Sequence, residues 1–372
     1  MKIIPVLLLG CGGVGRQLID HIVACRSLHS KQGLAIRVVG IGDSRSLIVV
    51  KDVFNMELED AFLKEICRIK SSGSSLSSLT DLGQSQIFKD SEAIKKIIDS
   101  ASLLGRSTGL VLVDCSASLE TIEVLKQAIC HGGCVVLANK KPLTSKIVGA
   151  GLPVIASVTR VLSSGDSICR IIGSLSGTLG YVMSELEDGR LFSSVVQEAK
   201  RLGYTEPDPR DDLSGMDVAR KALILARLLG QRINLEDIKV DSLYPNDMGP
   251  KSMPMDEFMS HGLPLLDRDV GERIEVAASK RNVLRYVCVV EGSRCQVGLQ
   301  ELPKDSPLGR LRGSDNVPLQ VELYSRCYKA APLVIQGAGA GNDSTAAGVL
   351  ADIVDLQDLF ALKDSPFKGE QR

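Results

Sequence analysis

The sequence has almost no net charge and no long apolar run. Its 44 Lys and Arg residues nearly balance 45 Asp and Glu residues, which leaves a formal net charge of −1. Such a balance argues against nucleic acid as a partner, because the phosphate backbone selects strongly basic surfaces. No run of about 18 apolar residues, the length of a membrane span, occurs along the chain. We therefore expect no association with nucleic acid or membrane.

The sequence also lacks the patterns of a secreted or zinc-binding protein. The apolar start, MKIIPVLLLGCGG, is too short and wrongly flanked for a signal peptide, and no transit peptide is clear. Ten cysteines are scattered along the chain; Cys130 and Cys134 flank His131, but no second ligand pair follows at zinc-site spacing. We expect a reduced, soluble, intracellular protein, with cytoplasm and plastid both open.

The chain has 372 residues, of which 44% are hydrophobic and 24% are charged, as in an ordinary globular protein. This length exceeds one typical core and predicts two domains.

The N-terminal region has the pattern of a dinucleotide-binding fold. An apolar run at residues 4–9 leads into a G-x-G-x-x-G turn and then into helical spacing. Strand, glycine turn and helix are the context in which backbone N–H groups approach a pyrophosphate. The candidate cofactor-binding residues of this turn are Gly10, Gly12, Gly13, Val14 and Gly15.

A second predicted strand, residues 35–41, ends near Asp43 and Arg45. An acidic residue at this position would hold the ribose hydroxyls of NAD, whereas an arginine would accept the 2′-phosphate of NADP. Both residues are present, so the sequence does not decide whether the cofactor is NAD or NADP.

Further strands and helices complete a predicted doubly wound parallel sheet. We expect helices separated by a serine-rich loop within residues 57–106, a strand at 109–114, a helix at 118–130 and a strand at 134–137. Ser116 follows one strand, and Asn139 and Lys140 follow the next. These side chains should lie at the carboxyl edge of the sheet, where ligands bind.

After Pro142 the strict alternation of strands and helices stops, which favours an α+β second domain. The expected strands lie at 154–158, 168–172, 272–278, 283–290 and 319–324, and the expected helices at 181–202 and 217–230. A second glycine-rich loop ending at Gly341 precedes a helical pattern at 344–356. It indicates that the chain returns to the nucleotide domain. The predicted domains are 1–142 for the nucleotide, 148–325 for catalysis and dimerisation, and 326–372 for the returning segment.

Asp217 and Lys221 are the candidate catalytic pair. They lie four residues apart in an apolar helical pattern, so the carboxylate and the ammonium share one helical face. An isolated pair of this spacing is usually a surface ion pair. Here the acidic loop before the helix and its apolar flanks favour a site.

Together these segments resemble homoserine dehydrogenases of the plant and fungal type, in which no aspartate kinase is attached. The resemblance rests on the glycine turn, VLANKKPL around Lys140, VGAGLPVI at 148–155, GSLSGTLGY at 173–181, YTEPDPRDDLSGMDVARK at 204–221 and GAGAGNDSTAAGVLADI at 337–353. One glycine motif would be weak, whereas six motifs in the family's order are specific.

The resemblance implies interconversion of L-homoserine and L-aspartate 4-semialdehyde with NAD or NADP, in the aspartate-derived biosynthesis of threonine, methionine and isoleucine. It also implies a homodimer formed through the second domain. By position, Lys221 matches the catalytic lysine, and Asp217 and Glu206 match substrate-binding carboxylates. Lys140 matches a lysine beside cofactor and substrate, while Ser116 and Gly341 match cofactor positions. A monovalent cation, Na⁺, is implied at the backbone carbonyls of Val148, Ala150 and Leu152.

The chemistry agrees with these residue types. Oxidation of an alcohol needs a group that takes the hydroxyl proton, and the reverse reaction needs a donor. A lysine serves both directions when burial favours its neutral form, an effect that Asp217 would oppose. We therefore expect Asp217 and Glu206 to hold the substrate ammonium while Lys221 moves the proton.

One segment departs from the family pattern. Only residues 143–147 separate Pro142 from Val148, where the family has a longer connection with a helix and a strand. The alternative interpretation is a shortened, catalytically impaired chain that binds nucleotide or a full-length partner. A second rival, aspartate-semialdehyde dehydrogenase, requires a cysteine nucleophile assisted by a histidine. None of the four histidines lies in such a motif.

Overall fold

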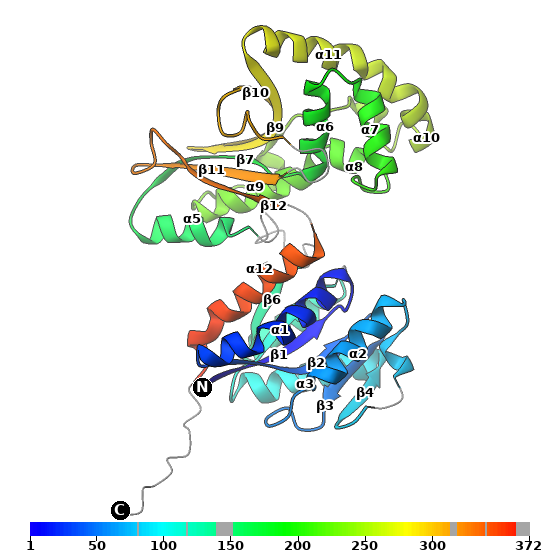
Figure 1. Cartoon of the computed structure of the whole chain (residues 1–372), viewed down its shortest axis with the longest axis vertical. Coiled ribbons are helices and arrows are strands. Elements are labelled where there is room, and N and C mark those ends of the chain that lie inside the picture. The colour runs from blue at the N-terminus through cyan, green and yellow to red at the C-terminus, as the bar shows by residue number, and fades with distance from the viewer. Residues whose placement is uncertain (80–81, 117, 139–151, 313–317, 339–340, 362–372) are drawn as a thin grey trace, which may run out of the picture. The chain divides into compact units, whose positions relative to one another are not determined.

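A computed structural model of the chain describes residues 1–79, 82–116, 118–138, 152–312, 318–338 and 341–361 (Figure 1). The chain divides into two compact units. Unit 1 comprises Met1–Leu143 and Gly341–Arg372, and unit 2 comprises Thr144–Ala340. The division before Gly341 lies later than the expected boundary at 325, because the strand at Leu333–Ala338 pairs with the strand at Pro318–Ser325 in unit 2.

Unit 1 is an α/β structure built on one sheet. The described strands have the order β4-β3-β2-β1-β5-β6. Its elements in chain order are β1 (Lys2–Leu9), α1 (Gly13–Lys31), β2 (Leu34–Gly42), β3 (Ser46–Val50), α2 (Asp60–Ser71), η1 (Leu76–Ser78), β4 (Ser85–Lys89), α3 (Asp90–Gly105), β5 (Val111–Asp114), α4 (Thr121–Cys130), β6 (Cys134–Leu137), α12 (Asn342–Asp355) and η5 (Leu356–Leu359).

The centre of this sheet is parallel, as a dinucleotide-binding fold requires. β1 pairs in parallel with β2 on one side and with β5 on the other. The strand order therefore reverses at β1, and ligands bind outside the carboxyl ends of such strands. Six of the eight residues of β1 are buried in the structure, and a strand buried on both faces is apolar along most of its sequence.

Two strands of unit 1 were missed by the sequence prediction. β3 and β4 form an antiparallel extension of the sheet beyond β2. β3 is a five-residue buried strand that follows β2 after a short turn, and β4 has the sequence SQIFK, which is only partly apolar. Short runs of this kind carry too little periodicity to separate a strand from a loop.

Unit 2 is an α+β structure with a second sheet, as expected. The described strands have the order β12-β11-β7-β9-β10-β8, and all pairs are antiparallel except β8 with β10. Its elements in chain order are α5 (Val154–Ser163), β7 (Ile168–Ser174), α6 (Gly177–Glu187), α7 (Phe192–Arg201), α8 (Arg210–Leu213), α9 (Met216–Leu228), η2 (Leu235–Asp237), β8 (Lys239–Val240), η3 (Asn246–Met248), α10 (Met255–Glu257), the π-helical η4 (Phe258–Gly262), α11 (Leu263–Ser279), β9 (Asn282–Glu291), β10 (Arg294–Pro303), β11 (Pro318–Ser325) and β12 (Leu333–Ala338).

Two of the strands expected in unit 2 are wrong. Residues 154–158 begin α5, in which Val154, Val158 and Val161 are buried at helical spacing. Residues 272–278 lie in α11, in which Val270 and Ala277 are buried seven residues apart. In both segments β-branched residues suggested strands, but burial of one helical face decides the structure.

The main core of unit 2 lies between its sheet and its helices. α9 contributes most of its length, since eight of its thirteen residues are buried. Apolar side chains of α6, α7 and α11 join the same cluster with β7, β9 and β11. A helix surrounded in this way holds its polar side chains in fixed positions, which matters for Lys221.

Candidate active site

The glycine turn after β1 allows a close backbone approach. Gly10 has φ +91°, and a Cβ at this residue would lie 2.4 Å from the backbone nitrogen of Ser116. A Cβ at Gly15 would lie 2.0 Å from the carbonyl oxygen of Gly10. Strand β1, helix α1 and the segment after β5 are therefore packed backbone against backbone at this point.

Gly12 faces open space. A Cβ at Gly12 would meet no atom of the described residues within 4 Å. Gly12 is also the N-cap of the 19-residue helix α1, whose first turn includes Gly13 and the half-buried Val14. Helix N-terminal N–H groups behind an open glycine turn fit a pyrophosphate.

The C-terminal segment returns to this turn. α1 packs against α12, and a Cβ at Gly13 would lie 2.3 Å from the side-chain nitrogen of Asn342. Gly341 has φ +137°, and its carbonyl oxygen accepts a hydrogen bond of 2.8 Å from Thr345 Oγ1. Gly341 thus lies at the start of α12, beside the N-terminus of α1.

Ser116 lies just beyond β5. Its backbone nitrogen donates to Asp114 Oδ1 at 2.8 Å, and Asp114 Oδ2 accepts a hydrogen bond of 2.7 Å from Thr121 Oγ1. Asp114 is fully buried. It fixes the loop so that Ser116 stands at the carboxyl edge of the sheet, next to Gly10.

Asp43 is committed to contacts within the protein. Its Oδ1 accepts hydrogen bonds from the backbone nitrogens of Arg45 and Ser46 at 3.1 and 2.9 Å. Its Oδ2 accepts from Leu76 N at 2.9 Å and from Lys70 Nζ at 3.0 Å. Only 6% of the side chain is exposed. The expected contact between Asp43 and a ribose stays a prediction, and the present geometry does not favour it.

The electrostatics of Asp43 agree with this structural role. Burial alone would raise the pKa of the carboxyl, but the hydrogen bonds from Leu76 N, Arg45 N and Lys70 outweigh it and lower the pKa. The carboxylate is therefore ionised and neutralised by Lys70. Arg45 is exposed on the same turn.

In unit 2, Lys221 and Asp217 form the predicted pair on α9. Lys221 Nζ lies 2.8 Å from Asp217 Oδ2 and donates a hydrogen bond of 2.6 Å to the carbonyl oxygen of Leu175. The lysine side chain is 11% exposed and the aspartate side chain 46% exposed. A buried ammonium thus stands beneath a carboxylate that reaches solvent.

The carbonyl that receives Lys221 comes from the turn between β7 and α6. Leu175 follows the end of β7, and Ser176 caps α6 by accepting a hydrogen bond of 3.2 Å from Leu179 N. Because the cap fixes the turn, the orientation of the Leu175 carbonyl is also fixed. The motif GSLSGTLGY therefore helps to place the lysine.

Two further polar side chains join the acidic loop, and the sequence prediction missed both. Thr178 Oγ1 donates to the carbonyl oxygen of Tyr204 at 2.6 Å and to Asp212 Oδ1 at 3.1 Å. Asp212 Oδ2 accepts a hydrogen bond of 2.8 Å from the backbone nitrogen of Glu206. Thr178 and Asp212 lie within two of the motifs on which the family resemblance rests, and these motifs could have identified both as site residues.

Asp212 has an unusual carboxyl group. Burial raises its pKa, and the neighbouring carboxylates Glu206 and Asp217 add to the rise, whereas hydrogen bonds from Glu206 N and Thr178 oppose it. Three acidic side chains therefore act on one another near the N-terminus of α9. Such a group of carboxylates suits a cationic ligand.

Arg210 holds the acidic loop in place. Its guanidinium donates to both oxygens of Asp208, and also to the carbonyl oxygens of Met248 at 3.2 Å and Met253 at 2.6 Å. It lies over the ring of Phe258, 5.1 Å from the centroid. Only 3% of the Arg210 side chain is exposed. The loop that carries Glu206 is thus anchored to the segment before α11.

The left-handed residue Gly215 connects the loop to α9. It has φ +72° and is the N-cap of α9. A Cβ at this position would lie 1.8 Å from the hydroxyl of Tyr286, and that hydroxyl donates to the carbonyl oxygen of Asp241 at 2.8 Å. Only glycine fits here, so Gly215 fixes where Asp217 enters the site.

Several predicted site residues lie outside the described residues. Asn139, Lys140, Val148 and Ala150 belong to this group, as does the short connector at 143–147. Of the expected cation ligands only Leu152 is described, and its carbonyl oxygen accepts a hydrogen bond of 2.7 Å from Val154 N.

Within the described residues, no group of three or more His, Cys, Asp and Glu side chains could hold a metal ion. Among the helices described, none is both long and apolar enough to cross a membrane.

Comparison with protein-family models gives a match to the second half of the chain. The model described as homoserine dehydrogenase matches residues 153–354. This range includes the pair on α9, the acidic loop and the start of α12.

Comparison with curated proteins finds relatives over most of the chain. The bifunctional aspartokinase/homoserine dehydrogenase of Haemophilus influenzae is 32% identical over 375 residues, which cover 95% of this chain and 43% of that protein. The homoserine dehydrogenase of Emericella nidulans is 43% identical over 220 residues, which cover 56% of this chain and 59% of that protein. The chain therefore spans less than half the length of the bifunctional relative.

Solved structures share the fold over nearly the whole chain. A Candida auris protein of unknown function has a TM-score of 0.81 at 29% identity, covering 97% of this chain and 99% of that chain. A hyperthermophilic archaeal homoserine dehydrogenase in complex with NADPH has a TM-score of 0.68 at 22% identity, covering 96% of this chain and 99% of that chain.

Proposed function

The chain belongs to the homoserine dehydrogenase family, and from this premise we propose that it interconverts L-homoserine and L-aspartate 4-semialdehyde with a nicotinamide dinucleotide. The observation that carries the proposal is the buried ammonium of Lys221, held 2.8 Å from Asp217 beside an acidic loop. This combination offers one group for proton transfer and several for binding an ammonium. The activity would serve the aspartate-derived biosynthesis of amino acids.

Unit 1 has the features of the cofactor site. The open face of Gly12 and the N-terminus of α1 fit the pyrophosphate, and Ser116 and Gly341 flank the same turn. These residues would hold a nicotinamide dinucleotide, which would supply the hydride-transfer chemistry. A solved archaeal homoserine dehydrogenase of this fold is in complex with NADPH, which supports the assignment.

Lys221 is proposed to move the proton. Its Nζ is held by the carbonyl oxygen of Leu175 and by Asp217, so its position relative to a bound substrate is fixed. During oxidation the neutral amine of Lys221 takes the proton of the substrate hydroxyl and becomes the ammonium, and during reduction the ammonium protonates the forming alkoxide and returns to the amine. A positioned acid or base of this kind contributes about 10²–10⁴-fold to the rate.

The carboxylates are proposed to bind the α-ammonium of the substrate. Asp217 is half-exposed and reaches solvent from the first turn of α9, while Glu206 extends from the exposed loop whose backbone is tied to Asp212. Asp212 adds a third carboxyl, whose raised pKa reflects its burial and its acidic neighbours. An ammonium among these groups would relieve their mutual repulsion.

A spectrophotometric assay tests this function. Purified protein with L-homoserine and NADP⁺ should form NADPH, and L-aspartate 4-semialdehyde should consume it. L-serine, which is one carbon shorter, serves as the control and should give at most a small fraction of the rate. Equal rates with both alcohols would show that the acidic loop does not select homoserine.

Of the two cofactors that the sequence left open, we propose NADP. The Asp43 carboxylate is neutralised by Lys70, and both of its oxygens already accept hydrogen bonds from backbone N–H groups. The exposed Arg45 on the same turn is the group suited to a 2′-phosphate. The Arg45→Ala variant should therefore raise the KM for NADP⁺ by roughly 10–100-fold, as expected for a charged hydrogen bond of about 1.5–3 kcal/mol.

The same variant should leave the KM for NAD⁺ nearly unchanged, because NAD⁺ carries no 2′-phosphate. Steady-state kinetics with both cofactors measures the contrast. An equal rise in the two KM values would assign Arg45 to the fold of the turn instead.

The glycine turn provides a second prediction about the cofactor. Gly12→Ala should leave the thermal midpoint unchanged, since its Cβ meets no described atom within 4 Å. It should nevertheless raise the KM for the cofactor about tenfold or more, because the added methyl group would occupy the position of the pyrophosphate. A loss of about 1.4 kcal/mol in binding free energy is enough for a tenfold change. Calorimetry and kinetics on one preparation separate the two effects.

Gly10→Ala is the matched contrast within the same turn. Its Cβ would collide with the backbone of Ser116, and its φ of +91° disfavours any L-residue. The expected loss is roughly 2–5 kcal/mol of stability. If Gly12→Ala were the more destabilising change, the open face at Gly12 would not be a ligand site.

We also propose a homodimer formed through unit 2. Within the described residues β12 pairs only with β11, so one of its edges is left for another strand. Val334 on this strand is 37% exposed. Light scattering during gel filtration should give twice the mass of 39.9 kDa for one chain, and replacing Val334 with lysine should shift the mass toward one chain.

The alternative of a catalytically impaired chain is not favoured. The curated relative from Haemophilus influenzae aligns with 95% of this chain, and α9 holds Lys221 and Asp217 in contact. Family membership likewise separates the chain from aspartate-semialdehyde dehydrogenases, which act through a cysteine nucleophile.

A further inference from the structure

Unit 2 contains a buried ion pair away from the residues discussed so far. Arg285 lies on β9, and Glu187 is the last residue of α6. Arg285 Nη2 donates a hydrogen bond of 2.9 Å to Glu187 Oε2. Only 3% of the arginine side chain and 12% of the glutamate side chain are exposed. The pair therefore joins a strand to a helix in a place that is largely shielded from water.

Backbone carbonyls occupy the remaining donors of Arg285. Its Nη1 donates to the carbonyl oxygen of Leu284 at 2.9 Å, and its Nε donates to that of Leu308 at 3.3 Å. Its Nη2 also donates to the carbonyl oxygen of Gly309 at 2.6 Å. The guanidinium is planar and presents its donors in a rigid fork, so acceptors on all three nitrogens leave it a single orientation.

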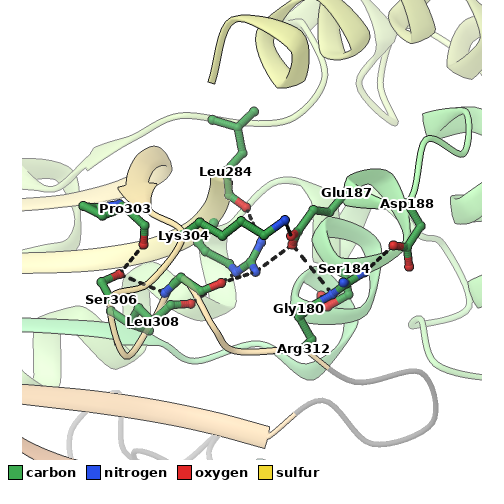
Figure 2. Close-up of polar contacts among 12 residues, drawn as sticks. Gly180, Ser184, Glu187, Asp188, Leu284, Pro303, Lys304, Ser306, Leu308 and Arg312 are labelled. Atoms are coloured by element: carbon green, nitrogen blue, oxygen red, sulfur yellow. Dashed lines mark hydrogen bonds and ion pairs between the residues drawn. The ribbon is translucent and has the colours of Figure 1, made fainter. Parts of the chain in front are cut away.

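The turn that supplies two of these carbonyls, residues 303–312, is itself closed by hydrogen bonds. Ser306 Oγ donates to the carbonyl oxygen of Pro303 at 2.7 Å and accepts a hydrogen bond of 3.0 Å from Gly309 N. Figure 2 shows Pro303, Ser306 and Leu308 in this turn. A Cβ at Gly309 would lie 2.0 Å from the carbonyl oxygen of Pro303, so the turn is tight. The carbonyl groups that receive Arg285 are therefore held in fixed positions.

Stability alone does not account for such a pair. Taking two charges out of water costs free energy, and well-packed apolar side chains of the same volume are often equally stabilising or more so. An arginine–carboxylate contact adds a defined geometry between the elements that carry the two groups. Here Arg285 and Glu187 define the position of α6 relative to β9.

From this pair, β9 leads to the start of α9. Tyr286 follows Arg285 and lies on the opposite face of the strand, because successive side chains alternate. The Tyr286 hydroxyl donates to the carbonyl oxygen of Asp241 at 2.8 Å and would lie 1.8 Å from a Cβ at Gly215. Gly215 is the N-cap of α9, two residues before Asp217. A shift of β9 at Arg285 would therefore move the surface on which α9 begins.

The other element of the pair, α6, leads to Lys221 and the acidic loop. Just before the helix, the carbonyl oxygen of Leu175 accepts the hydrogen bond of 2.6 Å from Lys221 Nζ. In its first turn, Thr178 Oγ1 donates to Asp212 Oδ1 at 3.1 Å. Glu187 follows Thr178 by nine residues, which is about 14 Å along one continuous helix. A change in the direction of α6 at Glu187 would therefore displace both contacts at its other end.

We propose that Arg285 and Glu187 are positioning residues for the proton transfer by Lys221. Two supports hold α9: β9 at Gly215, and the segment before α6 at Lys221. The ion pair keeps these supports in register, so that the Lys221 ammonium is presented to the substrate in one place. The catalytic consequence rests on the dehydrogenase function proposed above, whereas the effect on the position of α9 does not.

The Glu187→Ala variant tests the proposal by cutting only the link to α6. Arg285 keeps its three carbonyl partners, so β9 and the 303–312 turn stay joined. The kcat/KM for L-homoserine should fall by about 10–100-fold, because a displacement of about 1 Å at a reacting group costs up to about 10²-fold. The KM for the cofactor should stay the same, since unit 1 is unaltered. Steady-state kinetics, with the fold checked by circular dichroism, measures both.

Asp188→Ala is the matched control at the next residue. It removes an equal charge from a side chain that is 59% exposed and pairs with Arg312 at the surface (Figure 2). Its kinetic constants should equal those of the original protein. Equal losses in Asp188→Ala and Glu187→Ala would assign the effect to charge at the end of α6 and would overturn the role of the buried pair.

Arg285→Lys is the second variant, and it tests the pair from the side of β9. Lysine keeps the positive charge but lacks the planar fork that reaches several acceptors. It should lower kcat/KM for L-homoserine in the same direction, again without a change in the KM for the cofactor. If Glu187→Ala does not fold, Arg285→Lys decides the question, and unchanged kcat/KM in Arg285→Lys would refute the proposal.

Hydrogen exchange followed by mass spectrometry separates positioning from a local structural role. In both variants, amide exchange should rise in residues 204–221, which include the acidic loop and the first turns of α9, as well as at the end of α6. A rise confined to the end of α6, the start of β9 and the 303–312 turn would overturn the proposal. Because exchange needs no turnover, an inactive original protein would contradict the proposed function and leave this result decisive.

Discussion

Replacing Lys221 with methionine lowers kcat for homoserine oxidation by about 10²–10⁴-fold, the contribution expected of a positioned acid or base. Methionine keeps the length and the apolar stem of the buried side chain but removes the ammonium that contacts Asp217 and Leu175. Asp217 is 46% exposed and remains hydrated without its partner. The fold should therefore persist, as circular dichroism can verify.

Arg220→Met is the matched control for this loss. Arg220 is the preceding residue on α9 and is exposed, so its replacement removes a cation from the same helix without touching the pair. It should retain nearly full activity. A Lys221→Met enzyme with more than about a tenth of the original kcat would remove the lysine from the proton transfer, since even the lower limit expected for an acid or base exceeds that change.

Gly215→Ala is expected to have the largest effect on stability, roughly 2–5 kcal/mol. The left-handed backbone costs about 1–2 kcal/mol for an L-residue, and overpacking against Tyr286 adds about 1–3 kcal/mol. The new Cβ would lie 1.8 Å from the Tyr286 hydroxyl. Because Gly215 is the N-cap of α9, the displacement should also move Asp217 and reduce kcat/KM.

Gly203→Ala separates the two contributions. Gly203 has φ +73°, almost the same as Gly215, but a Cβ there meets no described atom within 4 Å. Denaturant unfolding followed by circular dichroism should show a loss of only about 1–2 kcal/mol for this variant. Similar losses in the two variants would mean that Tyr286 yields freely and that Gly215 does not fix the start of α9.

The sequence predicted the parts of the site that depend on local spacing. Asp217 and Lys221 lie four residues apart on a helix, and this spacing alone brings their side chains together. The glycine turn between β1 and α1 likewise follows from a local pattern with a known backbone geometry. In both cases the chain segment that carries the residues also positions them.

Contacts between distant segments were beyond the sequence. The Lys221 ammonium is held by Leu175, 46 residues earlier, and Asp212 is tied to Thr178, 34 residues earlier. Asp43 shows the same limit, because its position at the end of β2 suggested a ribose contact. Only the structure reveals that Lys70 and Leu76 return to occupy its carboxylate.

The wrong strands have a related cause. Three of the five residues at 154–158 and two of the seven residues at 272–278 are β-branched, and this residue type favours strands in isolation. Burial of Val154 and Val158 on one face of α5, and of Val270 and Ala277 on one face of α11, outweighs that preference. Local propensity is worth at most about 1 kcal/mol, whereas burial of one apolar side chain contributes about 1.5–3 kcal/mol.

The measurement that tests the central claim most directly is transfer of deuterium from L-homoserine labelled at its terminal carbon. With the purified protein and NADP⁺, mass spectrometry of the reduced cofactor should find one deuterium in each NADPH formed. Formation of unlabelled NADPH would contradict the proposed hydride transfer. So would the absence of NADPH under conditions in which a known homoserine dehydrogenase forms it.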